Sequence, residues 1–147
     1  MPDCPRAHRS DFVVFRAMTT RWMDNDVYGH VNNVVFYSWF DTAVNGYLVE
    51  QGVLDKDGGE AVGLVVETLC RYHAPVAFPE PVEVGLRVAR IGTSSVRYEL
   101  GIFRVGEDEA VADGHFVHVY VDQKSRRPIS IPEPLRTVLL PLTGDQS

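Results

Sequence analysis

A short polar segment of the chain brings together the residue types that acid–base chemistry needs. It contains two carboxylates, an imidazole and two amides, at Asp24, Asp26, His30, Asn32 and Asn33. A carboxylate can attack a carbonyl carbon or take a proton from water, and an imidazole can transfer protons near neutral pH. Gly29 lies among them and permits a backbone turn that other residues resist. The segment is therefore the candidate site of the chain.

An apolar helix is predicted directly after this segment. Phe36, Phe40 and Ala43 recur at steps of three and four residues, which is the helical period. The apolar arc is wide, so other parts of the fold should surround the helix. Asn32 or Asn33 is a suitable N-cap. The polar segment thus meets a helix start, whose free N–H groups and dipole favour an anion or a developing oxyanion.

The composition is that of a globular protein with one core. The 147 residues suffice for a single domain over residues 1–147, with a hydrophobic fraction of 45% and a charged fraction of 23%. No apolar run resembles a membrane span or a signal peptide, so we expect a cytoplasmic location. The net charge of −6 disfavours nucleic acid as a partner, although a local arginine cluster could hold a small phosphorylated ligand.

We expect neither thiol chemistry nor a bound metal at the site. Cys4 and Cys70 cannot form a disulfide framework, and neither lies near a nucleophile motif. Asp24, Asp26 and His30 could together ligate a divalent ion, but no fourth ligand stands in an obvious place.

The rest of the chain is predicted to be mainly strands. These cover residues 12–20, 62–72, 82–91, 96–105 and 110–121, with a loose terminus at 1–10 and a break at 73–81. The loop at 50–60 contains Gly52, a candidate helix stop, and a turn at Asp57-Gly58-Gly59. A short helix is expected at 132–140, with Leu135, Val138 and Leu139 on its inner face. Short turns between successive strands indicate antiparallel neighbours. His115 and His118 fall on the last strand, on opposite faces by its period of two, so they should not form a pair. The expected fold is α+β, a curved antiparallel sheet of about five strands wrapped round one long helix.

One motif carries a resemblance to a known family. It reads Asp24-x-Asp26-x-x-Gly29-His30-Val31-Asn32-Asn33-x-x-x-Tyr37. With a strand before it and a long apolar helix after it, the motif resembles the 4-hydroxybenzoyl-CoA thioesterase group of hotdog-fold acyl-CoA thioesterases. Lesser matches follow at Gly92-x-x-Ser95, Val121-Asp122, Arg127-Pro128 and Ile131-Pro132.

The resemblance implies roles for individual residues. Asp26 would be the catalytic carboxylate and the N–H near Asn33 the donor to the thioester oxygen, with Gly29 and His30 beside them. Three residues near the helix start would contact substrate: Tyr28, Asn32 and Tyr37. Basic and hydroxyl residues near the sheet ends would hold the CoA nucleotide: Arg90, Thr93, Ser94, Ser95, Arg126 and Arg127. Coenzyme A would enter as part of the substrate and not as a cofactor, and the protein would be a homodimer or homotetramer with active sites at a subunit interface.

Plainer interpretations compete with these roles. Asp24 and Asp26 could be turn residues whose side chains bond the local backbone, and Asn32 and Asn33 could simply cap the helix. His30 could be a loop residue. Three functions remain: hydrolysis of an acyl-CoA with Asp26 as nucleophile or general base, a non-catalytic acyl-CoA-binding module, and a hydratase or dehydratase on the same fold. The sequence leaves open the acyl group, the choice of CoA or carrier-protein thioester, and the choice of dimer or tetramer.

Overall fold

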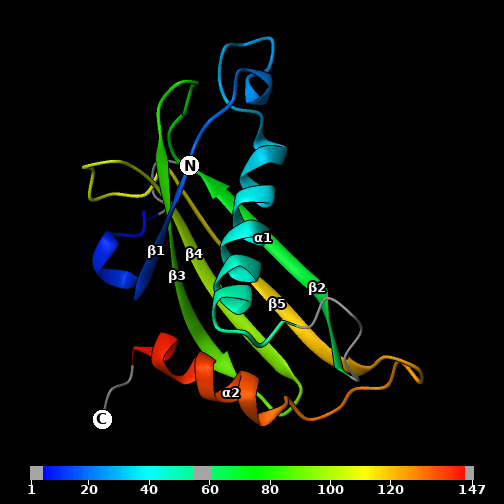
Figure 1. Cartoon of the computed structure of the whole chain (residues 1–147). Coiled ribbons are helices and arrows are strands. Elements are labelled where there is room, and N and C mark those ends of the chain that lie inside the picture. The colour runs from blue at the N-terminus through cyan, green and yellow to red at the C-terminus, as the bar shows by residue number, and fades with distance from the viewer. Residues whose placement is uncertain (1–4, 55–60, 145–147) are drawn as a thin grey trace.

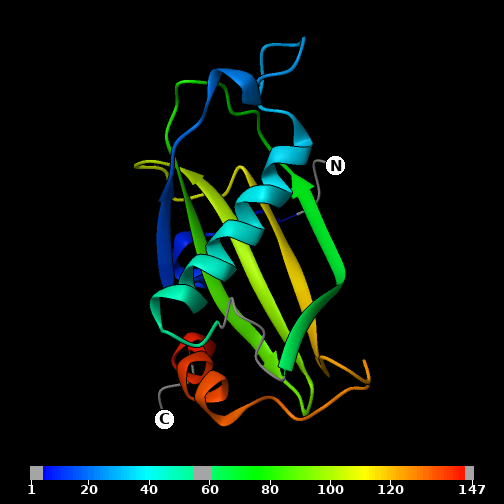
Figure 2. The same ribbon diagram turned by 45° about the vertical axis from the view of Figure 1, so that its right-hand side comes forward.

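The computed structural model describes residues 5–54 and 61–144. One antiparallel sheet has the strand order β1-β3-β4-β5-β2, and the long helix α1 crosses one of its faces (Figures 1 and 2). The strands are β1 Val14–Met18, β2 Ala61–Tyr72, β3 Val82–Ile91, β4 Ser95–Arg104 and β5 Ala112–Asp122. The α-helices are α1 Asn33–Glu50 and α2 Glu133–Leu139, and short 3₁₀ helices occupy Arg9–Asp11, Trp22–Asp24 and Leu140–Thr143. The predicted sheet with one long helix is confirmed.

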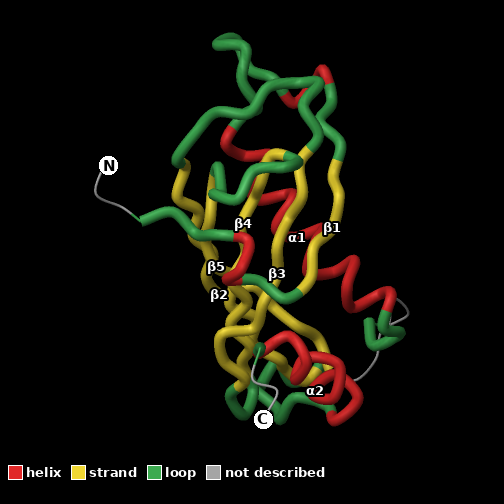
Figure 3. The backbone as a smooth tube through the Cα atoms, turned by 90° about the vertical axis from the view of Figure 1, so that its left-hand side faces the viewer, coloured by secondary structure: helices red, strands yellow, loops and turns green. Residues whose placement is uncertain are grey.

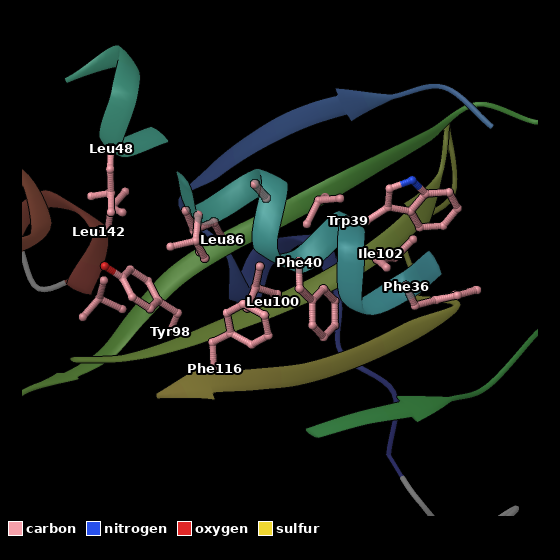
Figure 4. Close-up of a cluster of buried hydrophobic side chains, with 14 of the residues drawn as sticks. Phe36, Trp39, Phe40, Leu48, Leu86, Tyr98, Leu100, Ile102, Phe116 and Leu142 are labelled. Carbon is pink, nitrogen blue, oxygen red and sulfur yellow. The ribbon is translucent and has the colours of Figure 1, made fainter. Parts of the chain in front are cut away.

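The core lies between α1 and the sheet. Phe36, Phe40 and Leu48 point from the helix toward the strands (Figure 4). Phe40 meets Phe116 of β5 nearly edge-on, with 6.1 Å between the ring centroids. Burying one such phenylalanine stabilises the fold by about 1.5–3 kcal/mol. The wide apolar arc seen in the sequence is thus the surface by which α1 is fixed across the sheet.

Local signals place both ends of α1. The Asn32 side chain accepts a hydrogen bond of 3.0 Å from the Val34 N–H, which makes it the N-cap. Gly52 has a φ of 73°, a left-handed conformation that glycine adopts without strain, directly after the C-cap Gln51. The predicted helix start and stop are confirmed. The turn expected at Asp57-Gly58-Gly59 lies outside the described residues.

Residues 5–10 differ from the loose terminus expected there. The Arg9 guanidinium binds the Glu83 carboxylate at 2.8 Å, and the Ala7 N–H donates to Asp113 at 2.9 Å. Arg6 donates to the carbonyl of Ala110 at 2.8 Å. These partners lie more than seventy residues away in sequence, so no local pattern could reveal them.

The helix α2 closes the end of the sheet opposite the loop that precedes α1 (Figures 1 and 3). Leu135 and Leu139 are buried as predicted, and the Tyr47 hydroxyl of α1 donates to the carbonyl of Val138 at 2.6 Å. Among the helices in residues 5–54 and 61–144, none combines the length and apolar character needed to cross a membrane.

Candidate active site

Asp26 occupies a tight turn just before α1. Its backbone N–H donates to the carbonyl of His30 at 2.9 Å, and its carbonyl accepts from the Gly29 N–H at 3.0 Å. Gly29 has a φ of 81°, so the turn needs the freedom of glycine there. The Asp26 carboxylate accepts one hydrogen bond, from the Tyr28 N–H to Oδ1 at 2.8 Å. Within the described part of the chain Oδ2 has no hydrogen-bond partner, so it can face a substrate.

Asp24 has a different environment, although it lies only two residues away. Its side chain is 2% exposed and accepts hydrogen bonds from the backbone N–H and the guanidinium of Arg21, the shortest of them at 2.8 Å. Its backbone carbonyl also accepts from the Asn32 N–H at 2.8 Å. Asp24 therefore fixes the loop against the helix start, which agrees with the plainer interpretation of this residue.

The start of α1 leaves one backbone donor free. A helix start has four N–H groups without helical acceptors. Three of them are satisfied: Asn32 donates to the Asp24 carbonyl, Val34 to the Asn32 side chain and Val35 to the Asn32 carbonyl. The N–H of Asn33 is the fourth, and it has no acceptor among residues 5–54 and 61–144. This donor lies on an exposed residue, where it can reach an external oxygen.

A shallow pocket of about 330 Å³ opens beside this donor, with His30, Asn33 and Phe36 among its lining residues. Tyr72, at the end of β2, also lines it, and its hydroxyl donates to the Asn33 carbonyl at 2.9 Å. Burial raises the pKa of Tyr72, so the phenol keeps its proton. Tyr28, by contrast, projects into solvent, and Tyr37 packs its ring 6.4 Å from that of Phe40.

The CoA-binding candidates form a second group at the far end of the sheet. This group comprises Arg90 near the end of β3, Thr93 and Ser94 on the β3–β4 turn, Ser95 at the start of β4, and Arg126 and Arg127 on the segment after β5. Figure 1 places the β3–β4 turn and the segment after β5 at the end of the sheet where α2 lies, opposite the loop that contains Asp26. The 18-residue helix α1 lies between the two groups and spans about 27 Å. One copy of the chain therefore does not bring the predicted site residues together.

A family model decides what kind of protein this is. The model of the thioesterase-like superfamily matches residues 20–139, which include Asp26, the helix start and most of the sheet. The chain belongs to the thioesterase-like superfamily.

Solved structures share the fold of this superfamily member. The PA5185 protein of Pseudomonas aeruginosa strain PAO1 is 57% identical over 94% of this chain and 96% of that chain, with a TM-score of 0.90. Slr0204, a 1,4-dihydroxy-2-naphthoyl-CoA thioesterase of Synechocystis, is 16% identical over 86% of this chain and 94% of that chain, with a TM-score of 0.81, and shows the fold alone. The YsmA protein of Bacillus subtilis (strain 168) is 23% identical over 135 residues, 90% of this chain and 88% of its own length. The hotdog fold expected from the motif is confirmed.

Sequence reasoning missed two residues beside the site of this superfamily member. Tyr72 was expected only as a strand end, and His73 only as part of a break after it. The His73 side chain lines the shallow pocket and lies 2.9 Å, at Nε2, from the Asp113 carboxylate of β5. Both contacts join residues about forty positions apart, so they carry no local signal. Cys70, also on β2, is half-buried, and burial raises its pKa to about 11, which disfavours a nucleophilic thiolate.

Proposed function

We propose that this protein hydrolyses acyl-CoA thioesters, with Asp26 as the catalytic carboxylate and the Asn33 N–H as the oxyanion donor. The observation that carries the proposal is the Asn33 N–H, which has no acceptor among the described residues at an otherwise satisfied helix start, preceded by a turn whose Asp26 carboxylate has an oxygen without a described partner. A thioester oxygen gains negative charge when the carbonyl is attacked, so such a donor stabilises the transition state more than the ground state. A structural neighbour with the same fold, Slr0204, is named as a 1,4-dihydroxy-2-naphthoyl-CoA thioesterase.

Two routes use the same groups. In the first, Asp26 Oδ2 forms a bond to the thioester carbon, the oxyanion accepts from the Asn33 N–H, and the C–S bond breaks to release CoA thiolate. Water then hydrolyses the mixed anhydride. In the second, Asp26 takes a proton from a water molecule while that water attacks the carbonyl, and the C–S bond breaks in the same way. Both routes release a free acid and CoA.

A second copy of the chain supplies the missing half of the proposed site. β2 is an edge strand of 12 residues. Its exposed apolar side chains are Leu64, Val65, Val66, Leu69 and Tyr72. A long apolar edge favours pairing with another strand. Antiparallel pairing of two β2 strands about a two-fold axis would bring the Ala61 end of one copy to the Tyr72 end of the other.

This pairing joins the two groups of candidate residues. The Tyr72 end carries the helix start, because the Tyr72 hydroxyl binds the Asn33 carbonyl. The Ala61 end adjoins the end of β5 at Asp122, which precedes Arg126 and Arg127. Asp26 of one copy would thus act on a thioester whose CoA phosphates bind the basic segment of the other. The homodimer is the smallest assembly that completes the site.

The test is thiol release from a panel of aromatic and aliphatic acyl-CoAs by the wild type, Asp26→Asn and Asp108→Asn. Asp108 is an exposed carboxylate on the β4–β5 turn, so its variant repeats the chemical change away from the site. We expect hydrolysis by the wild type and Asp108→Asn and its loss in Asp26→Asn. Full activity in Asp26→Asn would remove the assigned mechanism. Binding of acyl-CoA by the wild type without any hydrolysis would support the acyl-CoA-binding module instead.

A further inference from the structure

A second pocket lies at the Glu50 end of α1, between the helix and the sheet. It has a volume of about 580 Å³ and is bounded by the end of α1, the start of β2, the end of β5 and the segment leading into α2. Its walls are mainly apolar and include Leu48, Val53 and Leu135. A pocket of this size and character is typical of small-molecule sites, in which a few polar groups orient the ligand.

His118 of β5 is the polar group of interest in this pocket. Its side chain lines the pocket and is 4% exposed, and neither ring nitrogen has a hydrogen-bond partner among the described residues. The rings of Tyr98 and Phe116 hold it at centroid distances of 5.3 and 5.9 Å. A buried polar group without a partner is costly, so such groups in native proteins usually bind water or a ligand.

The chemistry of this imidazole selects the kind of ligand. Burial lowers the pKa of His118, although the charge of Asp41 opposes the shift, so the ring is neutral at neutral pH. A neutral imidazole has one donor and one acceptor, which match a hydroxyl group. Asn45, the nearby amide of α1, already donates to the carbonyl and carboxylate of Asp41 at 3.0 Å. A charged ligand group would be desolvated among apolar walls, so a neutral hydroxyl fits better.

The position of the pocket links it to the proposed site of a second copy. Ala61, Val62 and Gly63 line it, and they belong to the end of β2 that would pair near Tyr72 of the other copy. An acyl group whose thioester lies at the helix start of one copy could therefore extend into the pocket of the other. In its own copy the pocket is separated from Asp26 by most of the length of α1.

We propose that the His118 pocket receives the far end of the acyl group and selects acyl groups that carry a hydroxyl there. The proposal rests on the proposed thioesterase function and names its substrate class. A hydroxyl satisfies the buried imidazole, whereas a hydrocarbon of the same shape leaves it unpaired in a dry pocket. A site built to bind a hydroxyl discriminates strongly against the analogue that lacks it.

The experiment compares acyl-CoAs in matched pairs of similar shape. One pair is para-hydroxyphenylacetyl-CoA with para-methylphenylacetyl-CoA, and the other is ω-hydroxyoctanoyl-CoA with nonanoyl-CoA. We expect the wild type to favour at least one hydroxylated member by roughly tenfold to a hundredfold in kcat/KM. His118→Leu should abolish the preference, and His118→Gln, which keeps a donor and an acceptor, should retain part of it. Val53→Ala enlarges the same pocket without altering its polarity and should affect both members alike.

Two outcomes would overturn the inference while leaving the thioesterase function intact. One is equal hydrolysis of the members of both pairs by the wild type, and the other is an unchanged preference in His118→Leu. If the wild type hydrolyses neither member of either pair, the result counts against the proposed thioesterase function on these substrates. The same pairs are then compared by binding calorimetry. Tighter binding of a hydroxylated member by the wild type but not by His118→Leu supports the pocket assignment, and equal binding overturns it.

Discussion

The two ends of α1 present opposite environments for polar groups. At the Asn33 end, Asp24 is buried, but Asn33 is exposed and Asp26 is half-buried. Among residues 5–54 and 61–144, the Asn33 N–H and one oxygen of the Asp26 carboxylate have no hydrogen-bond partner. At the Glu50 end, the surroundings are mainly apolar, and the buried imidazole of His118 has no hydrogen-bond partner within the part of the chain that the structure describes. The first environment suits bond cleavage, which needs water and an accessible carboxylate. The second suits recognition of an acyl group, and under the proposed function the two form one site across two copies.

The largest effect should come from Asp26 at the Asn33 end. Asp26→Asn removes the negative charge but keeps an oxygen that can accept from the Tyr28 N–H. We expect kcat to fall about 100-fold or more, the scale of a lost general base, with little change in unfolding free energy. Steady-state thiol release and urea unfolding measure the two quantities. A large loss of stability with unchanged activity would show that Asp26 is a turn residue only.

Asp24 should show the reverse pattern. Asp24→Ala removes a buried carboxylate that accepts three hydrogen bonds from Arg21. We expect the free energy of unfolding to fall by about 2–3 kcal/mol, as for hydrogen bonds to a charged group. Urea unfolding measures the loss, and activity per folded molecule should exceed that of Asp26→Asn. An Asp24→Ala protein as stable as the wild type would contradict the anchoring role.

A smaller effect is expected from the cap of α1. Asn32→Ala removes the acceptor for the Val34 N–H and should cost about 1 kcal/mol of stability. It also leaves a second N–H free beside that of Asn33, so activity should change less than in Asp26→Asn. Thermal unfolding with parallel activity assays checks both parts. Asn32→Asp, which keeps an acceptor, serves as the matched control and should retain the stability.

The smallest effect concerns pH at the Glu50 end. Burial lowers the folded-state pKa of His118, so the unfolded chain binds a proton first as pH falls. The stability that neutral His118 contributes is therefore complete above an unfolded-state pKa of about 6.5 and is lost as pH falls toward the folded-state value. We expect His118→Gln to lose less stability than the wild type between about pH 8 and pH 5.5. If urea unfolding gave the same fall in unfolding free energy for the wild type and His118→Gln, protonation of His118 would not destabilise the folded protein.

The sequence predicted what local patterns determine. The apolar spacing from Phe36 onward predicted α1, Asn32 was a predicted N-cap, and Gly52 predicted the end of the helix. The family motif predicted a hotdog-fold thioesterase, and the superfamily and the fold are confirmed. The roles of Asp26 and Asn33 stay predictions, with geometry that supports them.

The contacts that the sequence could not predict are those between distant segments. The hydrogen bond of the Tyr72 hydroxyl to the Asn33 carbonyl and the contact of His73 with Asp113 each join segments about forty residues apart. Their formation depends on which strands become neighbours. The separation of the loop before α1, which contains Asp26, from the segment after β5, which contains Arg127, is of the same kind, since only the folded sheet shows that these segments lie at opposite ends (Figure 1).

Subunit complementation tests the shared site most directly. Asp26→Asn chains are co-expressed with chains that carry Arg126→Ala and Arg127→Ala, and dimers with one chain of each kind are isolated. Each mixed dimer would hold one site with both defects and one with none, because Asp26 of one chain serves the basic segment of the other. The account predicts about half the wild-type activity per mixed dimer, with a wild-type KM. Activity no greater than the mean of the two parent homodimers would contradict a site shared between chains.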